Sequence, residues 1–219
     1  MSLPSDREIA KVCADTYAYD GPVAWDWQQE VNSVYVALRR IGDVDVVALR
    51  GSTTFTDWVR DLLALANPFE HDDLGPVHPG FYLGMPEVWH EVRAVLRQPV
   101  NWVCGGHSLG AGRCTVLTGL AALDGLAPAR YVRFGEPRPG FAQLTGILRP
   151  IPGASYRAAD ENGHDLVTSV PFHLPPLEDY EHPQPLTDVV VHPAADDPWV
   201  LFKYHHMQGY LSAIPGVTP

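Results

Sequence analysis

Residues 102–112 read W-V-C-G-G-H-S-L-G-A-G and place Ser108 at the centre of a G-x-S-x-G motif. An apolar segment precedes the motif, and small residues that would open a helix follow it. In a tight strand-to-helix turn the serine has a strained backbone, and the flanking glycines keep Cβ atoms out of the crowded turn. The motif alone is a weak signal, but in this context it predicts that Ser108 is an activated nucleophile.

A serine hydroxyl is a poor nucleophile at neutral pH, so it needs a histidine to accept its proton and a carboxylate to orient that histidine. The predicted carboxylate is Asp165, in the segment Y-R-A-A-D-E-N-G-H-D-L-V at residues 156–167, where a predicted strand ends in a polar loop. Asp160 and Glu161 lie in the same loop and remain alternatives. Any of these acids could also be an ordinary solvated loop residue.

The chain has ten histidines, most of them beside proline or acidic residues, where a surface position is the usual interpretation. His205 and His206 differ because they open the last amphipathic segment, Y-H-H-M-Q-G-Y-L at residues 204–211. We predict His205 as the base, since Met207 and Tyr210 would then face the body of the protein while His205 points toward the elbow. His206 remains the alternative.

The order Ser108, Asp165, His205 is that of α/β hydrolases, and with these residues the chain resembles the class 3, or fungal-type, lipase family. Five motifs occur in the family order: R-G-S with a following D-W pair (50–52 and 57–58), V-H-P-G-F (77–81), F-G-E-P-R (134–138), D-L-V (165–167) before Pro171, and H-x-M-x-x-Y (205–210). One departure is Ala111, where the family usually has another glycine. The resemblance covers most of the chain and implies an α/β-hydrolase fold, with a largely parallel central sheet flanked by helices.

The resemblance also implies an oxyanion hole formed by the backbone N–H groups of Ser52 and Leu109. Attack on an ester carbonyl produces an oxyanion that needs preorganised donors, and Leu109 follows the nucleophile at the start of a predicted helix. The alternative is that residues 51–53 are only a turn after the predicted strand 44–49, but the D-W pair favours the oxyanion role. His107, although inside the motif, is interpreted as structural.

An amphipathic stretch follows Ser52, and its apolar residues recur at helical spacing on one face. These residues are Phe55, Trp58, Val59, Leu62, Leu63 and Ala66. By resemblance, a helix at about 54–66 is a lid that covers the site when closed and contacts a lipid interface when open. Phe55, Trp58, Val59 and Leu62 would then bind substrate, whereas in an ordinary surface helix they would pack on the core.

The remaining sequence is consistent with one catalytic domain over residues 1–219, with 46% hydrophobic residues and no repeat or low-complexity linker. S-D-R-E at residues 5–8 is a capping box and predicts an N-terminal helix. Strand signals lie at 33–38, 44–49, 100–104, 131–134, 155–158 and 188–192, and helix signals at 86–96 and 109–123. This alternation predicts a parallel sheet, and the proline-rich segment 171–198 is expected to be an extended loop with one strand.

Composition narrows the partners of the protein. The 26 acidic and 15 basic residues give a formal charge of -11, which disfavours binding to nucleic acid and to anionic membrane surfaces. At most a peripheral apolar contact with a lipid interface is therefore expected.

Three cysteines, an odd number in predicted helix or strand positions, are expected to be buried thiols: Cys13, Cys104 and Cys114. Together with the absence of a signal-peptide pattern around residues 6–8, these thiols lead to the expectation of a cytoplasmic location.

The sequence indicates neither a metal nor another cofactor. His71, Asp72, Asp73 and His78 lie close together, but they lack a defined ligand spacing, and a solvated loop is the better interpretation.

These observations predict a serine carboxylic ester hydrolase that cleaves acylglycerols or other lipid esters through an acyl-enzyme intermediate. A short-chain or aryl carboxylesterase, or an acyltransferase, would use the same three residues. A non-catalytic binding module that keeps the fold is a further alternative, which the intact Ser108, Asp165 and His205 disfavour.

Overall fold

A mixed sheet runs through the part of the chain that the computed structural model describes, residues 2–18, 21–52, 68–172, 179–193 and 203–215. Its strands are β1 (Trp27–Val31), β2 (Val34–Ile41), β3 (Val44–Leu49), β6 (Trp102–His107), β7 (Arg130–Phe134), β8 (Gly153–Asp160), β9 (Gly163–His164) and β10 (Leu186–Val190). Their order is β1-β2-β3-β6-β7-β8-β10, and β9 pairs with β8 off this path. A separate hairpin joins β4 (Phe69–His71) to β5 (Gly75–Val77).

Neighbouring strands from β3 to β10 are parallel, whereas β1, β2 and β3 are joined antiparallel. Every residue of β3 and β6 is buried, as expected for interior strands of a parallel sheet that is covered on both faces. These strands therefore lack the polar and apolar alternation of a half-exposed strand. The predicted largely parallel sheet flanked by helices is confirmed.

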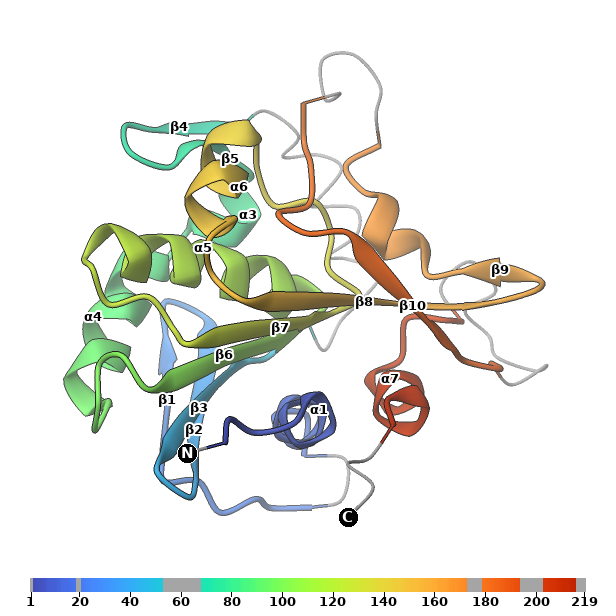
Figure 1. Cartoon of the computed structure of the whole chain (residues 1–219), viewed down its shortest axis with the longest axis horizontal. Helices are drawn as coiled ribbons and strands as arrows, with labels where there is room; N and C mark the ends of the chain where they lie inside the picture. Colours follow the sequence, from blue (N-terminus) through green and yellow to red (C-terminus); the bar gives the residue numbers. More distant parts are fainter. Residues whose placement is uncertain (1, 19–20, 53–67, 173–178, 194–202, 216–219) are drawn as a thin grey trace.

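Helices cover both faces of the sheet (Figure 1). α1 (Asp6–Asp15) and α7 (Met207–Ala213) pack together on one face. The other face carries α3 (Pro79–Tyr82), α4 (Met85–Val95), α5 (Leu109–Leu123) and α6 (Ala142–Leu148). A short 3-10 helix, η1 (Leu166–Ser169), follows β9. Because α1 and α7 are neighbours, the first and last described helices support the same face of the sheet.

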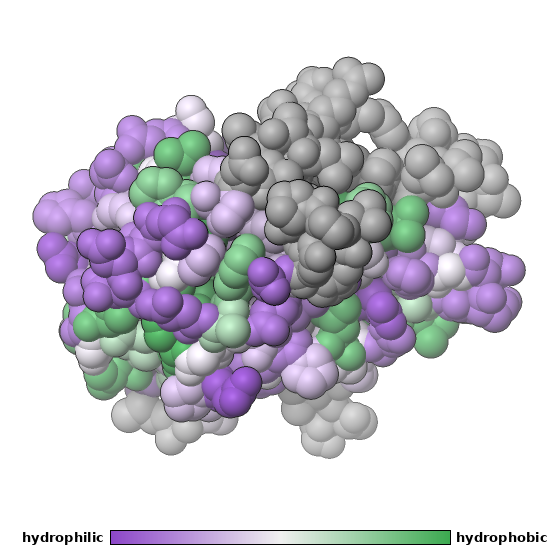
Figure 2. Space-filling model, turned by 90° about the horizontal axis from the view of Figure 1, so that it is seen from above, coloured by the Kyte–Doolittle hydropathy of each residue, from purple (hydrophilic) through white to green (hydrophobic). Residues whose placement is uncertain are grey.

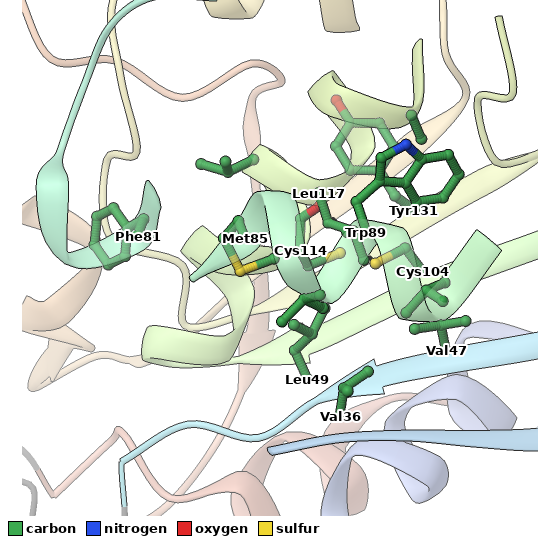
Figure 3. Close-up of a cluster of buried hydrophobic side chains, with 14 of the residues drawn as sticks. Val36, Val47, Leu49, Phe81, Met85, Trp89, Cys104, Cys114, Leu117 and Tyr131 are labelled. Atoms are coloured by element: carbon green, nitrogen blue, oxygen red, sulfur yellow. Dashed lines mark hydrogen bonds between the residues drawn. The ribbon is translucent and has the colours of Figure 1, made fainter. Parts of the chain in front are cut away.

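Hydrophobic clusters hold these helices on the sheet. In the cluster shown in Figure 3, Cys104 of β6 packs with Trp89 of α4 and Leu117 of α5. On the opposite face, Ile9 of α1 and Tyr210 of α7 belong to a second cluster. The cysteines are free and buried, as predicted: Cys13, Cys104 and Cys114. The sheet therefore has an apolar core on each side.

The predicted elements agree best where the local signal is strongest. β3 and α5 have the predicted bounds, and α1 begins with the predicted capping box. The strand predicted at 100–104 is wrong at both ends, because β6 spans Trp102–His107 and its glycines continue the strand into the elbow. β8 extends beyond the predicted 155–158 at both ends, and β10 begins two residues earlier than predicted, because pairing between strands sets their ends.

Hydrophilic side chains cover much of the described surface on the face seen in Figure 2, with smaller groups of hydrophobic side chains between them. None of the described helices is long and apolar enough to cross a membrane. The helix predicted at about 54–66 lies outside the described residues, and so do Phe55, Trp58, Val59 and Leu62.

A buried ion pair joins β7 to the loop that follows it. Arg133 Nε and Glu136 Oε2 are 3.1 Å apart, and both side chains are fully buried. The Glu136 carboxylate also accepts hydrogen bonds from the hydroxyls of Thr115 and Ser155. Burial alone would raise the pKa of Glu136, but Arg133, His182 and the hydrogen bonds outweigh it and lower this pKa. Glu136 is therefore ionised and connects β7 with α5 and β8.

Glu136→Gln should lower the free energy of unfolding by about 3–5 kcal/mol, because it leaves the buried Arg133 guanidinium without its counter-charge. The matched control is Asp188→Asn, whose carboxylate pairs with Arg157 near the surface and should contribute about 1 kcal/mol or less. Urea unfolding followed by tryptophan fluorescence measures both changes. Equal losses in the two variants would contradict the importance of the buried pair.

The same pair predicts how stability depends on pH. Because the pKa of Glu136 is lowered on folding, its contribution is complete above the ordinary value of 4.5 and is lost as the pH falls through the folded-state value. As the pH falls below about 4.5, the melting temperature of the wild type should therefore fall more steeply than that of Glu136→Gln.

Candidate active site

The predicted site residues lie where neighbouring parallel strands end. β3 leads into Ser52 and β6 leads into Ser108, and the register of these strands pairs Leu49 with Gly106. Loops that follow adjacent parallel strands meet at the same edge of a sheet, which is where such folds place their sites. Ser52 and Ser108 are therefore brought to one edge.

Ser108 occupies the predicted elbow between β6 and α5. Its backbone angles, φ 61° and ψ -130°, lie outside the regions that non-glycine residues prefer. A Cβ on Gly106 would lie 2.1 Å from the carbonyl oxygen of Gly110, and a Cβ on Gly110 would lie 2.1 Å from that of Leu49. Glycine is thus required at both positions. The Ser108 N–H donates to the carbonyl of Phe134 at 3.0 Å, which holds the elbow against β7.

Asp165 reaches the same edge because the chain reverses. β8 continues to Asp160, and β9 then returns antiparallel beside it. The N–H of Asp165 consequently donates to the carbonyl of Ala158 at 2.8 Å. The hairpin thus places Asp160 at the end of β8 and brings Asp165 back beside Ala158.

The Asp165 carboxylate is fully buried and accepts three hydrogen bonds. Oδ1 accepts from the N–H of Val167 at 3.0 Å, and Oδ2 accepts from His205 Nδ1 at 2.6 Å and from the Tyr210 hydroxyl. Burial alone would raise the pKa of Asp165, but His205 and these hydrogen bonds outweigh it and lower this pKa. Asp165 is therefore ionised. Burial and Asp165 raise the pKa of Tyr210 well above its ordinary value, so Tyr210 is a neutral donor.

His205 directly precedes the N-cap of α7 and is 6% exposed. Because Nδ1–H donates to Asp165, a neutral His205 has its lone pair on Nε2, the tautomer that a general base needs. Gly135, with φ +58°, supports this pair, since a Cβ there would lie 2.7 Å from Asp165 Oδ2 and 2.8 Å from His205 Cε1. A larger residue at this position would displace the pair.

The alternative acids and base have different surroundings. Asp160 accepts a hydrogen bond from the Tyr204 hydroxyl and another from the N–H of Asn162 at 2.7 Å. Glu161 is exposed in the turn between β8 and β9, and His206 is exposed at the N-cap of α7. The structure therefore joins His205 to Asp165.

Ser108 and His205 are held near each other by their neighbours. His107 directly precedes Ser108, and its ring stacks on that of His205 with centroids 4.8 Å apart. Phe134 accepts from the Ser108 N–H and directly precedes Gly135, which lies against His205. Among the described residues, the buried Ser108 Oγ has no hydrogen-bond partner. Hydrogen bonds between a nucleophile and its base are often long before substrate binds.

Of the two predicted oxyanion donors, Leu109 directly follows Ser108, and Ser52 follows a glycine that packs close to Ser108. Leu109 is the first residue of α5, so its N–H has no acceptor in a preceding helical turn and lies at the positive end of the helix. Gly51 packs against the elbow, since a Cβ there would lie 2.7 Å from the carbonyl oxygen of His107 and 3.0 Å from Ser108 Cβ. The half-buried Ser52 follows Gly51. The turn after β3 thus approaches Ser108.

The histidines of the β4–β5 region have local hydrogen bonds. His71 Nδ1 accepts from the N–H groups of Asp73 and Leu74, each at 3.1 Å, and His78 Nδ1 accepts from that of Gly80 at 3.1 Å. In the described part of the chain, no group of three His, Cys, Asp or Glu side chains could hold a metal ion.

Three residues in this region make contacts that the sequence does not predict. Tyr210 and Gly135 lie in recognised motifs, but a motif does not show that the Tyr210 hydroxyl reaches Asp165 or that Gly135 touches His205. Tyr17 carries no motif signal, yet its hydroxyl lies 2.7 Å from His107 Nδ1. These contacts join residues that are distant in sequence.

Comparisons with known proteins identify a matching family and structures of similar fold. A family profile described as lipase (class 3) matches residues 46–174. Triacylglyceride lipase from Rhizomucor miehei has a TM-score of 0.62 and 17% identity, covering 85% of this chain and 77% of that chain. A Rhizomucor miehei lipase propeptide complex has a TM-score of 0.65 and 17% identity, covering 85% of this chain and 67% of that chain. Mono- and diacylglycerol lipase from Aspergillus oryzae has a TM-score of 0.58 and 20% identity, covering 80% of this chain and 65% of that chain. No curated protein matches the chain.

The structural likenesses show a shared fold at low sequence identity. The family profile covers more than half of the 219 residues, and the matched segment 46–174 includes Ser52, Ser108 and Asp165. His205 lies beyond that segment and contacts Asp165 through the hydrogen bond described above. The chain therefore belongs to the class 3 lipase family, has the α/β-hydrolase fold and is a lipid ester hydrolase.

Proposed function

We propose that the protein hydrolyses acylglycerol esters in two steps, through an acyl group carried on Ser108. His205 acts as general base and acid, and Asp165 orients it. The observation that carries this proposal is the buried 2.6 Å hydrogen bond from His205 Nδ1 to Asp165 Oδ2, beside a serine with a strained backbone. This arrangement supports activation of the Ser108 hydroxyl at neutral pH.

In the first step, Ser108 Oγ attacks the ester carbonyl carbon while His205 Nε2 accepts the hydroxyl proton. The ionised Asp165 stabilises the imidazolium that forms. The tetrahedral intermediate collapses as His205 gives the proton to the departing alcohol. In the second step, His205 deprotonates a water molecule, which attacks the acyl-serine, and the carboxylic acid leaves as Ser108 recovers its proton.

The N–H groups of Ser52 and Leu109 bind the oxyanion of each tetrahedral intermediate. Leu109 supports this role because it opens α5, where the helix dipole favours negative charge. Gly51 supports it because its contact with the elbow sets the turn that carries Ser52 against Ser108. Donors that are preorganised in this way stabilise developing charge without rearranging during the reaction.

Acylglycerols are proposed as substrates for two reasons. The chain belongs to a lipase family, and structures of the same fold are named as triacylglyceride lipase and as mono- and diacylglycerol lipase. Esters of short acids carry the same reacting group, so they provide the comparison that tests this assignment.

Ser108→Ala should lower kcat for p-nitrophenyl ester hydrolysis by at least about 10,000-fold, because no nucleophile remains. Ser212→Ala is the matched control, since it removes an exposed hydroxyl that donates to the carbonyl of Gln208.

Assays with esters from acetate to palmitate, below and above their solubility limits, test the substrate class. A rate increase above the limit supports the acylglycerol assignment, and preference for dissolved acetate contradicts it.

Asp165→Asn should lower kcat by about 10,000-fold, because an amide at this position no longer favours the required tautomer of His205. Asp160→Asn should keep activity close to that of the wild type, because the contacts of Asp160 are with Tyr204 and Asn162. Steady-state kinetics on both variants, with circular dichroism to verify folding, measure the difference. A greater loss in Asp160→Asn would mean that the acid is wrongly assigned.

His205→Ala should lower kcat by at least about 10,000-fold, because the proton acceptor is lost. His206→Ala removes an exposed neighbouring imidazole and should retain activity. The same kinetic assay compares these adjacent positions, and the opposite ranking would assign the base to His206.

A further inference from the structure

Tyr17 connects three segments of the active site although it follows the first helix of the chain. Its hydroxyl oxygen accepts from the N–H of Gly51 at 3.1 Å and lies 2.7 Å from His107 Nδ1. His107 Nε2 lies 3.0 Å from the carbonyl oxygen of His205. Hydrogen bonds therefore run from the turn that carries Ser52, through Tyr17 and His107, to the backbone of His205.

The chemistry of the groups fixes the direction of each hydrogen bond. A carbonyl oxygen can only accept, so His107 Nε2 carries a hydrogen and donates to His205. In a neutral imidazole the other nitrogen then has a lone pair, so His107 Nδ1 accepts from the Tyr17 hydroxyl. The Tyr17 oxygen remains available to accept from Gly51. Every donor in this series has an acceptor.

We propose that Tyr17 and His107 are positioning residues, which set the oxyanion turn against the nucleophile elbow and hold the backbone of His205. This inference rests on the proposed function, since it assigns Ser52 to the oxyanion hole. Neither residue needs to touch the reacting atoms. Tyr17 acts through Gly51, whose orientation sets that of the Ser52 N–H.

The packing around Gly51 supports this role independently of the hydrogen bonds. A Cβ at Gly51 would lie 2.3 Å from the Tyr17 hydroxyl oxygen, in addition to its close approach to the elbow. Glycine therefore lets the turn fit between Tyr17 and Ser108. The hydroxyl of Tyr17 is one wall of the space that this turn occupies.

The arrangement requires His107 to be neutral. Burial lowers the pKa of His107 well below its ordinary value of 6.5, and the adjacent His205 lowers it further. The His205 ring, which stacks on His107, becomes cationic in the proposed reaction, and a second cation there would oppose this step. The titratable groups that face His107 are Tyr17, Asp165, His205, His206 and Tyr210.

Tyr17→Phe is the direct test, because it keeps the ring that packs edge-on against His107 and removes only the hydroxyl. We expect kcat, calculated per active site titrated to completion with a fluorophosphonate, to fall about 10- to 100-fold, since small misplacements of catalytic groups have effects of this size. KM for a dissolved p-nitrophenyl ester should change by less than about twofold, because the loss falls on the transition state.

Tyr156→Phe is the matched control. This variant removes a different tyrosine hydroxyl, which donates to Asp6 of α1. It should leave kcat per titrated site at the wild-type value. If Tyr17→Phe reduces the number of titratable sites without reducing kcat per site, or if both variants lose kcat equally, the role of Tyr17 is only structural and the proposal is overturned.

His107→Gln provides a second variant. A glutamine amide keeps a donor for the His205 carbonyl but has no acceptor at the position of Nδ1, so we expect a loss of kcat similar to that of Tyr17→Phe. The double variant should be no slower than the slower single variant, because both changes break one connection. Additive losses would contradict a shared connection.

Ser108→Ala, with its rate calculated per mole of protein because it has no serine to titrate, separates failure of the positioning role from failure of the proposed function. An inactive Ser108→Ala together with a fully active Tyr17→Phe would overturn only the positioning role. Activity that survives in Ser108→Ala would overturn the proposed function and, with it, the inference that rests on it.

Discussion

The burial of the Asp165 carboxylate constrains the rest of the site. A buried charge is tolerated only when it is paired and hydrogen-bonded. Asp165 accepts from His205, from Tyr210 and from the N–H of Val167, which belong to the loop before α7, to α7 and to η1. The C-terminal part of the chain must therefore return to the strand edge. The position of α7 beside α1 follows from this requirement as well as from apolar packing.

His205 is held at two different points by two different kinds of interaction. Asp165, an ionised group, orients the imidazole through Nδ1. His107, a neutral group, donates to the backbone carbonyl of His205 and stacks on its ring. In the proposed reaction, Asp165 stabilises the imidazolium that forms, and the neutral His107 adds no second cation beside it. Together they restrict the position of His205.

Local signals predicted much of the fold. The capping box of α1, the bounds of β3 and α5 and the elbow at Ser108 all depend on residues that are close in sequence. The ends of β6 and β8 were predicted less well, because pairing with other strands decides where a strand stops. The same limit left Asp160 and Glu161 as alternatives to the predicted Asp165, since the length of the β8–β9 hairpin determines which acid returns to the strand edge.

The sequence by itself determined the class of the protein and the order of its proposed nucleophile, acid and base, because the elbow and the family motifs are short, contiguous patterns whose chemistry depends on residue type. Only the tertiary structure decided which atoms meet. Tyr17 and His107 are 90 residues apart, and Gly51 and Gly135 are constrained by side chains from other segments. Contacts of this kind arise from the packing of α1, α7 and the strand ends against one another, which no periodic pattern along the chain records.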